Sequence, residues 1–236
     1  MAESWTLSRF AEVIAGGLVV SCQAPAGHPM RDTETMRRVA EAAVVGGAVA
    51  IRCGGVGGTP DISAVAAAVD VPVIGLIKSG AQGVFITPTV ETALEVVAAG
   101  ADVVAVDGTG RVRPDGRTLG ATVEAVHAAG GLVMADVSTP DEGLVAALIS
   151  ADMIATTLAG YTNGSSVPDG PDLALVRTLR EQLPHMLILA EGRYTTPELA
   201  SAALEAGADA VVVGTAITDI AWTTRRFAGA MRLPGP

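Results

Sequence analysis

The sequence predicts an α/β fold, a single (β/α)8 TIM barrel with an additional N-terminal helix. Three observations predict it. Apolar runs of strand length occur eight times, amphipathic stretches separate them, and a Gly-rich corner recurs before several runs, as in Gly100-Ala-Asp-Val-Val-Ala-Val-Asp. Strict alternation of strands and helices, with glycine as the helix C-cap, is typical of a parallel barrel.

The predicted elements follow one another without a linker. We therefore expect residues 1–236 to form one domain, with residues 1–16 as an N-terminal helical segment (the helix itself at 3–15) and residues 17–236 as the barrel. The strands are expected at the apolar runs 18–22, 48–52, 72–78, 103–107, 132–136, 153–157, 186–190 and 210–214. Amphipathic helices are expected between them, among them 89–98, 119–129, 140–149 and 196–206.

The longest polar loop spans residues 160–170, is rich in Gly and Ser, and is expected to be a mobile flap over the site. The alternative fold is a doubly wound open sheet. It is disfavoured because no Gly-x-Gly-x-x-Gly segment follows the first predicted strand.

Composition and charge exclude several classes of function. Half of the residues are hydrophobic but only 3% are aromatic, as expected for a sheet covered on both faces by helices. The net charge of −10 argues against nucleic acid as a partner, so an anionic ligand must be bound by local donors. No apolar run reaches the roughly 18 residues of a membrane span, so no membrane partner is expected.

The N-terminal residues, the cysteines and the histidines indicate the compartment and the cofactor requirement. The first residues lack the basic start and apolar core of a signal peptide. Cys22 and Cys53 fall at predicted strand ends and are expected to be free thiols, as in a cytoplasmic protein. We expect no metal, because the histidines are scattered at His28, His127 and His185, and no nicotinamide cofactor, because no dinucleotide-binding loop is present.

The chain has 14 arginines and a single lysine, Lys78, at the end of the apolar run 71–78. Arginine stays protonated in proteins, whereas burial and neighbouring charges tune a lysine amine. A solvated charge would be expected on a polar helix face. A lone lysine at the tip of an apolar strand therefore indicates a chemical role, as a base or in a Schiff base.

Every predicted strand ends on a polar group or on a Gly-Thr pair. In this fold the active site lies at the C-terminal ends of the strands, so these groups should meet there. In chain order they are Gln23, Arg52, Lys78, Asp107, Asp136, Thr156 with Thr157, Glu191, and Gly214 with Thr215.

Strand periodicity predicts that Lys78 and Glu191 face each other across the mouth of the barrel. If both point inward, the alternation of side chains along a strand places an apolar floor beneath them, made of Ile74, Leu76, Leu187 and Leu189. Such a pair suits proton transfer. A structural salt bridge between the two side chains is the alternative.

A phosphate site is expected beside this pair. Barrels of this type often bind phosphate on the loops after strands seven and eight and at the N-terminus of a short extra helix. Here those loops carry Gly192-Arg193 and Gly214-Thr215. The glycines let backbone N–H groups approach an anion, and Arg193 adds charge. A simple turn at Gly214-Thr215 is the alternative.

Nine collinear motifs between residues 17 and 218 resemble one known family. They are Gly17-Leu-Val-Val-Ser-Cys-Gln23, Gly47-Ala-Val-Ala-Ile-Arg52, Pro72-Val-Ile-Gly-Leu-Ile-Lys78, Val84-Phe-Ile-Thr-Pro-Thr, Asp107-Gly-Thr-Gly-Arg-Val-Arg-Pro-Asp-Gly, Met134-Ala-Asp-Val-Ser-Thr, Ala155-Thr-Thr-Leu-Ala-Gly-Tyr-Thr162, Ala190-Glu-Gly-Arg and Val213-Gly-Thr-Ala-Ile-Thr. In these motifs the chain resembles the N-acetylmannosamine-6-phosphate 2-epimerases of amino-sugar and sialic acid breakdown.

The resemblance implies an isomerase that inverts C2 of N-acetylmannosamine 6-phosphate to give N-acetylglucosamine 6-phosphate, without a cofactor. It implies that Lys78 and Glu191 are catalytic. It also implies sugar contacts from Gln23, Arg52 and Asp136, and a phosphate site on the backbone of Gly192, Gly214 and Thr215.

The chain departs from the family pattern at two places. The loop at residues 79–83, Ser-Gly-Ala-Gln-Gly, is shorter and less polar than the acidic, Tyr-containing loop usual there. Asp219 stands where the family commonly has a phosphate-binding arginine. Because a carboxylate repels phosphate, either Arg193 or another arginine compensates or the affinity for phosphate is weakened.

Three other functions fit the residues. A Schiff-base aldolase acting on a phosphosugar also uses a lysine at a barrel mouth. An isomerase of nucleotide or tryptophan synthesis would share only the fold. A non-catalytic sugar-phosphate sensor would keep the pocket but would not need both Lys78 and Glu191.

The C-terminal segment, residues 217–233, is unusually apolar for a surface helix. Trp222 and Phe227 lie five positions apart, so both cannot face the barrel well. One interpretation is a broad stripe that faces the core. The other is that this helix packs against or exchanges with a second subunit, since members of the resembled family form dimers, and we expect a homodimer.

Overall fold

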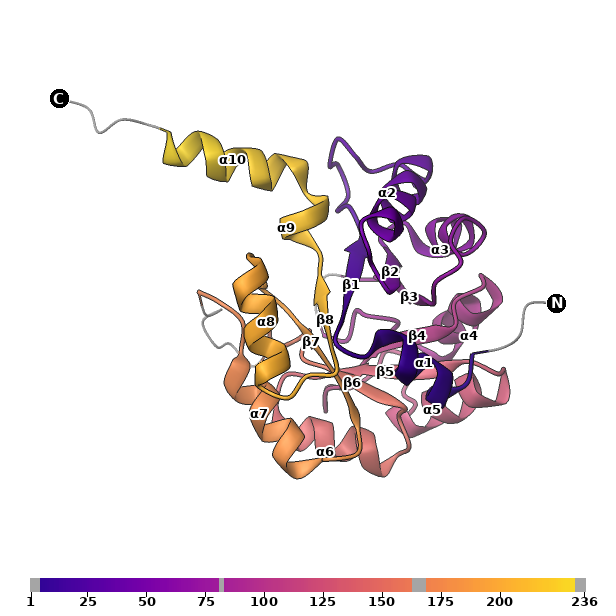
Figure 1. Ribbon diagram of the computed structural model, residues 1–236. Coiled ribbons are helices and arrows are strands. Elements are labelled where there is room, and N and C mark those ends of the chain that lie inside the picture. The colour runs from indigo at the N-terminus through magenta and orange to yellow at the C-terminus, as the bar shows by residue number, and fades with distance from the viewer. Residues whose placement is uncertain (1–4, 81–82, 163–168, 232–236) are drawn as a thin grey trace.

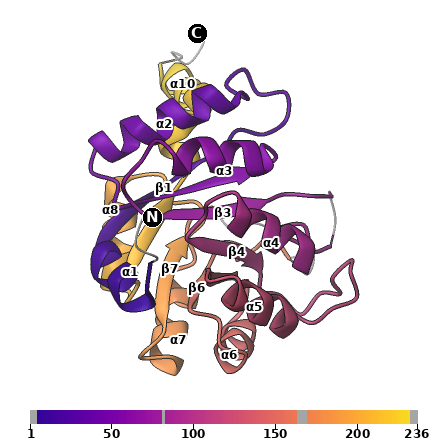
Figure 2. The same ribbon diagram turned by 90° about the vertical axis from the view of Figure 1, so that its right-hand side faces the viewer.

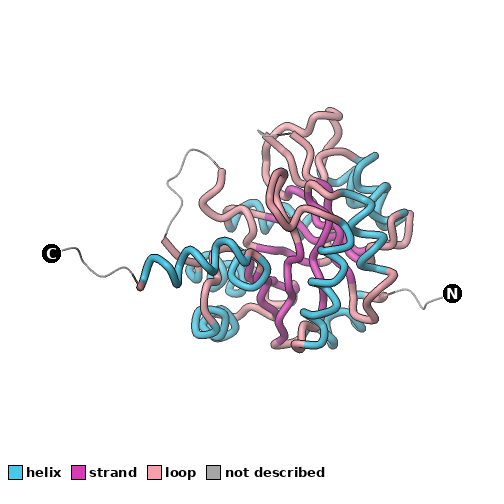
Figure 3. Tube along the Cα trace, turned by 90° about the horizontal axis from the view of Figure 1, so that it is seen from above, coloured by secondary structure: helices cyan, strands magenta, loops and turns pink. Residues whose placement is uncertain are grey.

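The computed structural model describes residues 5–80, 83–162 and 169–231. Within these ranges eight parallel strands close into a barrel in chain order, with β8 paired to β1, which confirms the predicted TIM barrel (Figures 1 and 3). The strands are β1 (Gly17–Cys22), β2 (Ala50–Gly55), β3 (Val73–Ile77), β4 (Val103–Asp107), β5 (Leu132–Asp136), β6 (Met153–Ala155), β7 (Leu187–Glu191) and β8 (Ala210–Val213).

A helix follows each strand; those after β1 to β7 lie on the outside of the barrel (Figure 2), and the short helix after β8 lies at the cavity. These helices are α2 (Thr33–Val45), α3 (Gly58–Ala66), α4 (Val90–Ala98), α5 (Leu119–Ala128), α6 (Pro140–Leu148), α7 (Leu173–Gln182), α8 (Pro197–Glu205) and α9 (Thr215–Thr218). Threonine N-caps begin four of them: the hydroxyls of Thr89, Thr118, Thr139 and Thr196 each accept from a backbone N–H of the first turn.

The recurring corner before a strand, Gly-Ala-Asp or Ser-Ala-Asp, has a second function besides ending a helix. Its carboxylate accepts a hydrogen bond from the N–H at the start of the preceding strand. This holds at three corners, where Asp102 binds Val73, Asp152 binds Val133 and Asp209 binds Ile188. Each acidic side chain therefore joins two adjacent strands at the end of the barrel away from the site.

The N-terminal helix α1 (Leu7–Ile14) closes that same end of the barrel. Its Phe10 and Ile14 are fully buried and pack into the cluster of side chains that fills the barrel interior. The helix is shorter than the expected 3–15, because Thr6 is the N-cap; residues 1–4 lie outside the described range.

The C-terminal segment differs from the single surface helix that the sequence suggested. Asp219 ends the short helix α9 and is the N-cap of a second helix, α10 (Ile220–Ala230). No residue of α10 is buried, so the core-facing stripe was wrong. Figures 1 and 3 show α10 projecting away from the barrel. Residues 232 and 233 lie outside the described range.

No helix in the described part of the chain is both long and apolar enough to cross a membrane. Cys22 and Cys53 are buried free thiols, as expected, and pack in the layer between the strands and the outer helices. Burial raises the pKa of Cys22 to about 12, so this thiol stays protonated.

Candidate functional site

A cavity of about 830 Å³ opens at the C-terminal ends of the strands. Its wall includes side chains from five of the eight predicted strand ends, and also the two glycine loops after β7 and β8. The predicted site residues that line it are Gln23, Arg52, Lys78, Glu191, Gly192, Arg193, Gly214 and Thr215. Among the described residues, no three His, Cys, Asp or Glu side chains converge as ligands of a metal ion.

Arg52, at the centre of β2, organises the acidic side chains of the site. One nitrogen donates to Glu191 and the other donates to Asp136 Oδ2 at 2.6 Å. Arg52 is 2% exposed and Asp136 is fully buried, so this charge network is shielded from water. Asp136 does not line the cavity, and therefore reaches a ligand there through Arg52 in this structure.

Thr157 connects the two carboxylates from the other side. Its hydroxyl lies 2.7 Å from Asp136 Oδ1 and 3.0 Å from Glu191 Oε2. A hydroxyl has one proton to donate, so only one carboxylate can receive it at a time. Burial is the main reason that the pKa of Asp136 is raised to about 7, with Glu191 adding to the rise and Arg52 opposing it.

Lys78 follows β3 directly and extends toward this network. Burial lowers the pKa of its amine first, and the positive charge of Arg52 lowers it further, while Glu191 and Asp136 act in the opposite direction. Glu191 pairs with Arg52 and not with Lys78. The alternative of a structural Lys78–Glu191 salt bridge is therefore not what the structure shows.

The apolar floor predicted beneath the two side chains is confirmed. Ile74 and Leu76 from β3 and Leu189 from β7 belong to the buried interior cluster of the barrel, and Leu187 from β7 packs against it. The same cluster contains Val212 from β8, which also lines the cavity. The amine thus lies between an apolar barrel interior and a buried ionic network.

The glycines after Arg52 bring neighbouring groups close, and the sequence reading missed them. The carbonyl of Gly55 accepts a hydrogen bond of 2.9 Å from the N–H of Lys78. A Cβ on Gly54 would clash with the carbonyl oxygen of Leu76, and one on Gly55 would clash with the side-chain oxygen of Gln23. A Gly-Gly pair two residues after the charged Arg52 was the available signal in the sequence.

The two loops expected to bind phosphate lie on one wall of the cavity. Gly192 has φ +114°, which favours glycine, and Gly214 is the N-cap of α9. The Arg193 guanidinium donates to the carbonyls of Gly170 and Ala159 at 2.6 and 2.8 Å. In this structure its hydrogen bonds therefore hold the ends of the loop between β6 and α7, whose residues 163–168 lie outside the described range.

Asp219 is engaged by the protein in two ways. Its Oδ1 accepts from the Trp222 N–H at 2.8 Å, as an N-cap of α10, and lies 3.3 Å from Nε2 of His28. The N-cap bond is the main reason that the pKa of this carboxyl is lowered, and His28 adds to the effect. His28 also lines the cavity, which the sequence reading did not anticipate.

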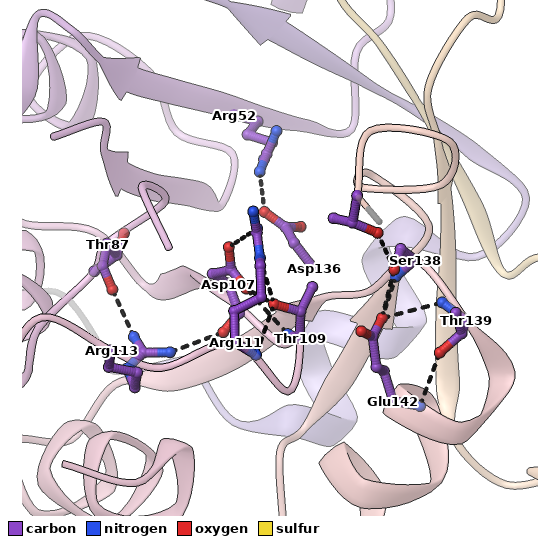
Figure 4. Close-up of polar contacts among 11 residues, drawn as sticks. Arg52, Thr87, Asp107, Thr109, Arg111, Arg113, Asp136, Ser138, Thr139 and Glu142 are labelled. Atoms are coloured by element: carbon purple, nitrogen blue, oxygen red, sulfur yellow. Dashed lines mark hydrogen bonds and ion pairs between the residues drawn. The ribbon is translucent and has the colours of Figure 1, made fainter. Parts of the chain in front are cut away.

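Asp107, the last residue of β4, does not line the cavity. Its carboxylate accepts from Thr109 at 2.6 Å and from Arg111 at 2.5 Å (Figure 4). Asp107 therefore orders the loop that follows it. The polar residues at the strand ends thus include some that line the cavity and some that do not.

Comparison with known proteins identifies one epimerase family that matches most of the chain. The family model described as "Putative N-acetylmannosamine-6-phosphate epimerase" matches residues 36–233. Relatives described as 2-epimerases for the same compound are 48% identical over 215 residues in Corynebacterium glutamicum strain R and 49% identical over 221 residues in Cutibacterium acnes. These alignments cover 91% and 93% of this chain, and 93% and 95% of the relatives.

Among solved structures, the N-acetylmannosamine-6-phosphate 2-epimerase from Clostridium perfringens superimposes with a TM-score of 0.90 at 36% identity. The match covers 98% of this chain and 100% of that one. Orotidine 5'-phosphate decarboxylase from Pyrococcus horikoshii matches with a TM-score of 0.59 at 19% identity, which shows the shared fold alone.

Proposed function

Because this chain belongs to the N-acetylmannosamine-6-phosphate epimerase family, we propose that it interconverts N-acetylmannosamine 6-phosphate and N-acetylglucosamine 6-phosphate. The observation that carries the proposal is the single lysine of the chain, which lines the cavity next to the charged Arg52–Glu191 pair. The alternatives from the sequence, an aldolase or a sensor, lack this family support.

Binding begins at the phosphate. The backbone of Gly192, Gly214 and Thr215 lies on one wall of the cavity and supplies donors for an anion in a protein of net charge −10. Arg193 and His28 line the same cavity and add donors close to these loops. Fixing the phosphate there positions C1 and C2 toward Lys78, and positioning of this kind contributes a large share of a rate enhancement.

The chemical step is proton exchange at the carbon next to a carbonyl. Ring opening exposes an aldehyde at C1, and the neutral Lys78 amine removes the proton from C2. The lowered pKa of Lys78 increases the fraction of neutral amine near neutral pH. Return of a proton to the opposite face of C2 inverts the centre.

Arg52 and Glu191 act on the oxygens. The Arg52 guanidinium is fixed by Asp136, so its charge is preorganised to stabilise the enolate-like intermediate. Glu191 is held by Arg52 and Thr157 at the cavity wall, where it can move protons to and from sugar oxygens. Gln23, whose amide donates to Ser21 Oγ at 2.9 Å, also lines the cavity, where it is the proposed contact for a sugar hydroxyl.

The test is an NMR assay of purified protein with N-acetylmannosamine 6-phosphate, following the acetamido signals of both sugars. We expect conversion to an equilibrium mixture, approached from either sugar. Conversion that survives exhaustive chelation supports the proposed cofactor-free chemistry, and activity restored by one divalent ion contradicts it. Borohydride with substrate separates the aldolase: covalent trapping on Lys78 indicates a Schiff base, and the epimerase is not trapped.

We also propose that the protein is a cytoplasmic homodimer. Helix α10 projects from the barrel and exposes apolar side chains: Ile220 is 61% exposed, Phe227 67% and Met231 79%. A second copy would cover this helix symmetrically, in an interface of about 1,600 Å² or more. Sedimentation should give twice the mass of the chain, and Phe227→Glu should give a monomer. A wild-type monomer with full activity contradicts the proposal.

A further inference from the structure

The segment that follows Lys78 folds back beside it. Lys78 and Ile86 form an antiparallel bridge, and the N–H of Ser79 donates to the carbonyl of Phe85 at 3.0 Å. The last residue of β3, Ile77, pairs with Thr87 on the returning segment. The backbone around the lysine is therefore held from one side by Gly55 and from the other by residues 85–87.

Thr87 binds both polar backbone groups of Ile77. Its N–H donates to the Ile77 carbonyl at 2.7 Å, and its hydroxyl oxygen accepts from the Ile77 N–H at 3.3 Å. The hydroxyl proton goes to the carbonyl of Ala105 on β4 at 2.6 Å. Thr87 has φ +42°, an unfavourable conformation for a β-branched residue that surrounding contacts must maintain.

Arg113 supplies those contacts from the loop after β4. One guanidinium nitrogen donates to the Thr87 carbonyl at 2.8 Å and the other to the Asp107 carbonyl at 2.9 Å (Figure 4). Arg113 is 5% exposed and does not line the cavity, so it cannot contact a ligand there. Burial lowers the pKa of its guanidinium, which shows that placing this charge here has a cost.

We propose that Arg113 is a positioning residue that acts through Thr87 to fix the Ile77–Lys78 backbone, so that the amine stays beside the Arg52–Glu191 pair. The inference deepens the proposed function and rests on Lys78 as its base. Arg113 is a buried cation that binds the carbonyls of Thr87 and Asp107 and no carboxylate. Its contact with Thr87 continues to Ile77, the residue before the lysine.

The first experiment compares Arg113→Gln with Arg117→Gln, an exposed arginine four positions later, as the matched control. Arg113→Gln should lower kcat at least about tenfold, the equivalent of 1.4 kcal/mol in the barrier, with KM changed less than about threefold. The control should match the wild type. A kcat within about twofold of wild type in folded Arg113→Gln overturns the proposal.

The second experiment needs no substrate, so it separates failure of this inference from failure of the proposed epimerase. Because the chain has one lysine, protein labelled with [ε-13C]lysine gives a single Lys78 signal whose titration reports the amine. The groups that act on this amine are Arg52, Glu191 and Asp136. In Arg113→Gln the pKa should rise toward the ordinary 10.5, because a displaced amine is better solvated. An unchanged titration contradicts the inference.

A third pair of variants covers the case in which Arg113→Gln does not fold. Thr87→Ala removes the hydroxyl that binds Ile77 and Ala105, and Thr87→Ser keeps it. Thr87→Ala should lose kcat and shift the Lys78 titration in the same direction as Arg113→Gln, and Thr87→Ser should restore both. If Thr87→Ala and Thr87→Ser both match the wild type in kcat and titration, the proposed path from Arg113 to Lys78 is wrong.

Discussion

Arg52 and Asp136 form a buried ion pair, with a guanidinium nitrogen 2.6 Å from Asp136 Oδ2. The residues lie 84 positions apart, on β2 and β5, and meet across the barrel. Asp136 thereby fixes one arm of the guanidinium and leaves the other to hold Glu191 at the cavity wall. The same fixed positive charge helps to lower the pKa of Lys78.

Asp136→Asn should therefore destabilise the protein and impair catalysis together. Removing one partner of a buried pair leaves the other charge poorly compensated, a loss of about 3–5 kcal/mol in the free energy of unfolding. Denaturant unfolding measures this loss. Glu34→Gln is the control, because Glu34 pairs with Arg37 and Arg38 at the surface and its loss should change little. Equal stability of the two variants would contradict the assignment.

Gly54→Ala should displace the end of β3 that carries Lys78. Gly54 has φ +100°, and a Cβ there would clash with the Leu76 carbonyl oxygen. Gly47→Ala is a matched control, since Gly47 has φ +99° but nothing lies near its missing Cβ. Both variants should lose free energy of unfolding, because alanine is strained at a positive φ. Gly54→Ala should lose about 1–3 kcal/mol more, because its Cβ also overpacks the site. The comparison uses denaturant unfolding and kcat; equal losses in both variants exclude the close approach as the cause.

Two ionisations should determine the pH dependence of kcat/KM, and the loss of a proton from either group should raise it. Lys78 acts as a base only when neutral, so activity rises as pH passes through its lowered pKa and levels off below pH 10.5. Asp136, whose pKa is raised to about 7, holds Arg52 best when ionised, so activity also falls below about that pH. A profile that declines between pH 7 and 9 would contradict both assignments.

The positive charge on Lys78 should cost stability at neutral pH, because the pKa of its amine is lowered in the folded protein. The folded-state pKa lies below the unfolded value near 10.5, so the folded protein binds fewer protons and gains stability as pH rises from the lowered pKa toward 10.5. Lys78→Met removes this cost and should raise Tm at pH 7 while abolishing activity. Thermal unfolding measures it, and a lower Tm in Lys78→Met would show that the charged amine stabilises the fold.

Periodic and chemical signals in the sequence predicted the fold and the principal charged residues of the cavity wall. Eight apolar runs with Gly-rich corners specify parallel strands, and the barrel then brings Arg52, Lys78 and Glu191 to one end regardless of their separation in sequence. Strand alternation was sufficient to predict the interior position of Leu76 and Leu189.

The pairing of charges could not be read from the sequence. The alternation of side chains along the strands predicted that Lys78 lies opposite Glu191. In the structure Glu191 forms its ion pair with Arg52, and the choice of partner depends on the geometry of the barrel. The roles of Arg113 and Thr87 were equally hidden, because both act through backbone carbonyls and amides that no side-chain motif encodes. The break before α10 depends on Asp219 as an N-cap, a local signal that the apolar pattern obscured.

The most direct test of the central claim is the fate of the C2 proton when the reaction runs in D2O. If Lys78 removes this proton, product formed by the wild type carries deuterium at C2, and substrate incubated with Lys78→Arg acquires none. Arginine keeps the charge but does not release its proton, so kcat/KM of this folded variant should fall far more than about tenfold. Product that keeps its original C2 proton, or a Lys78→Arg variant that still exchanges it, would contradict the account.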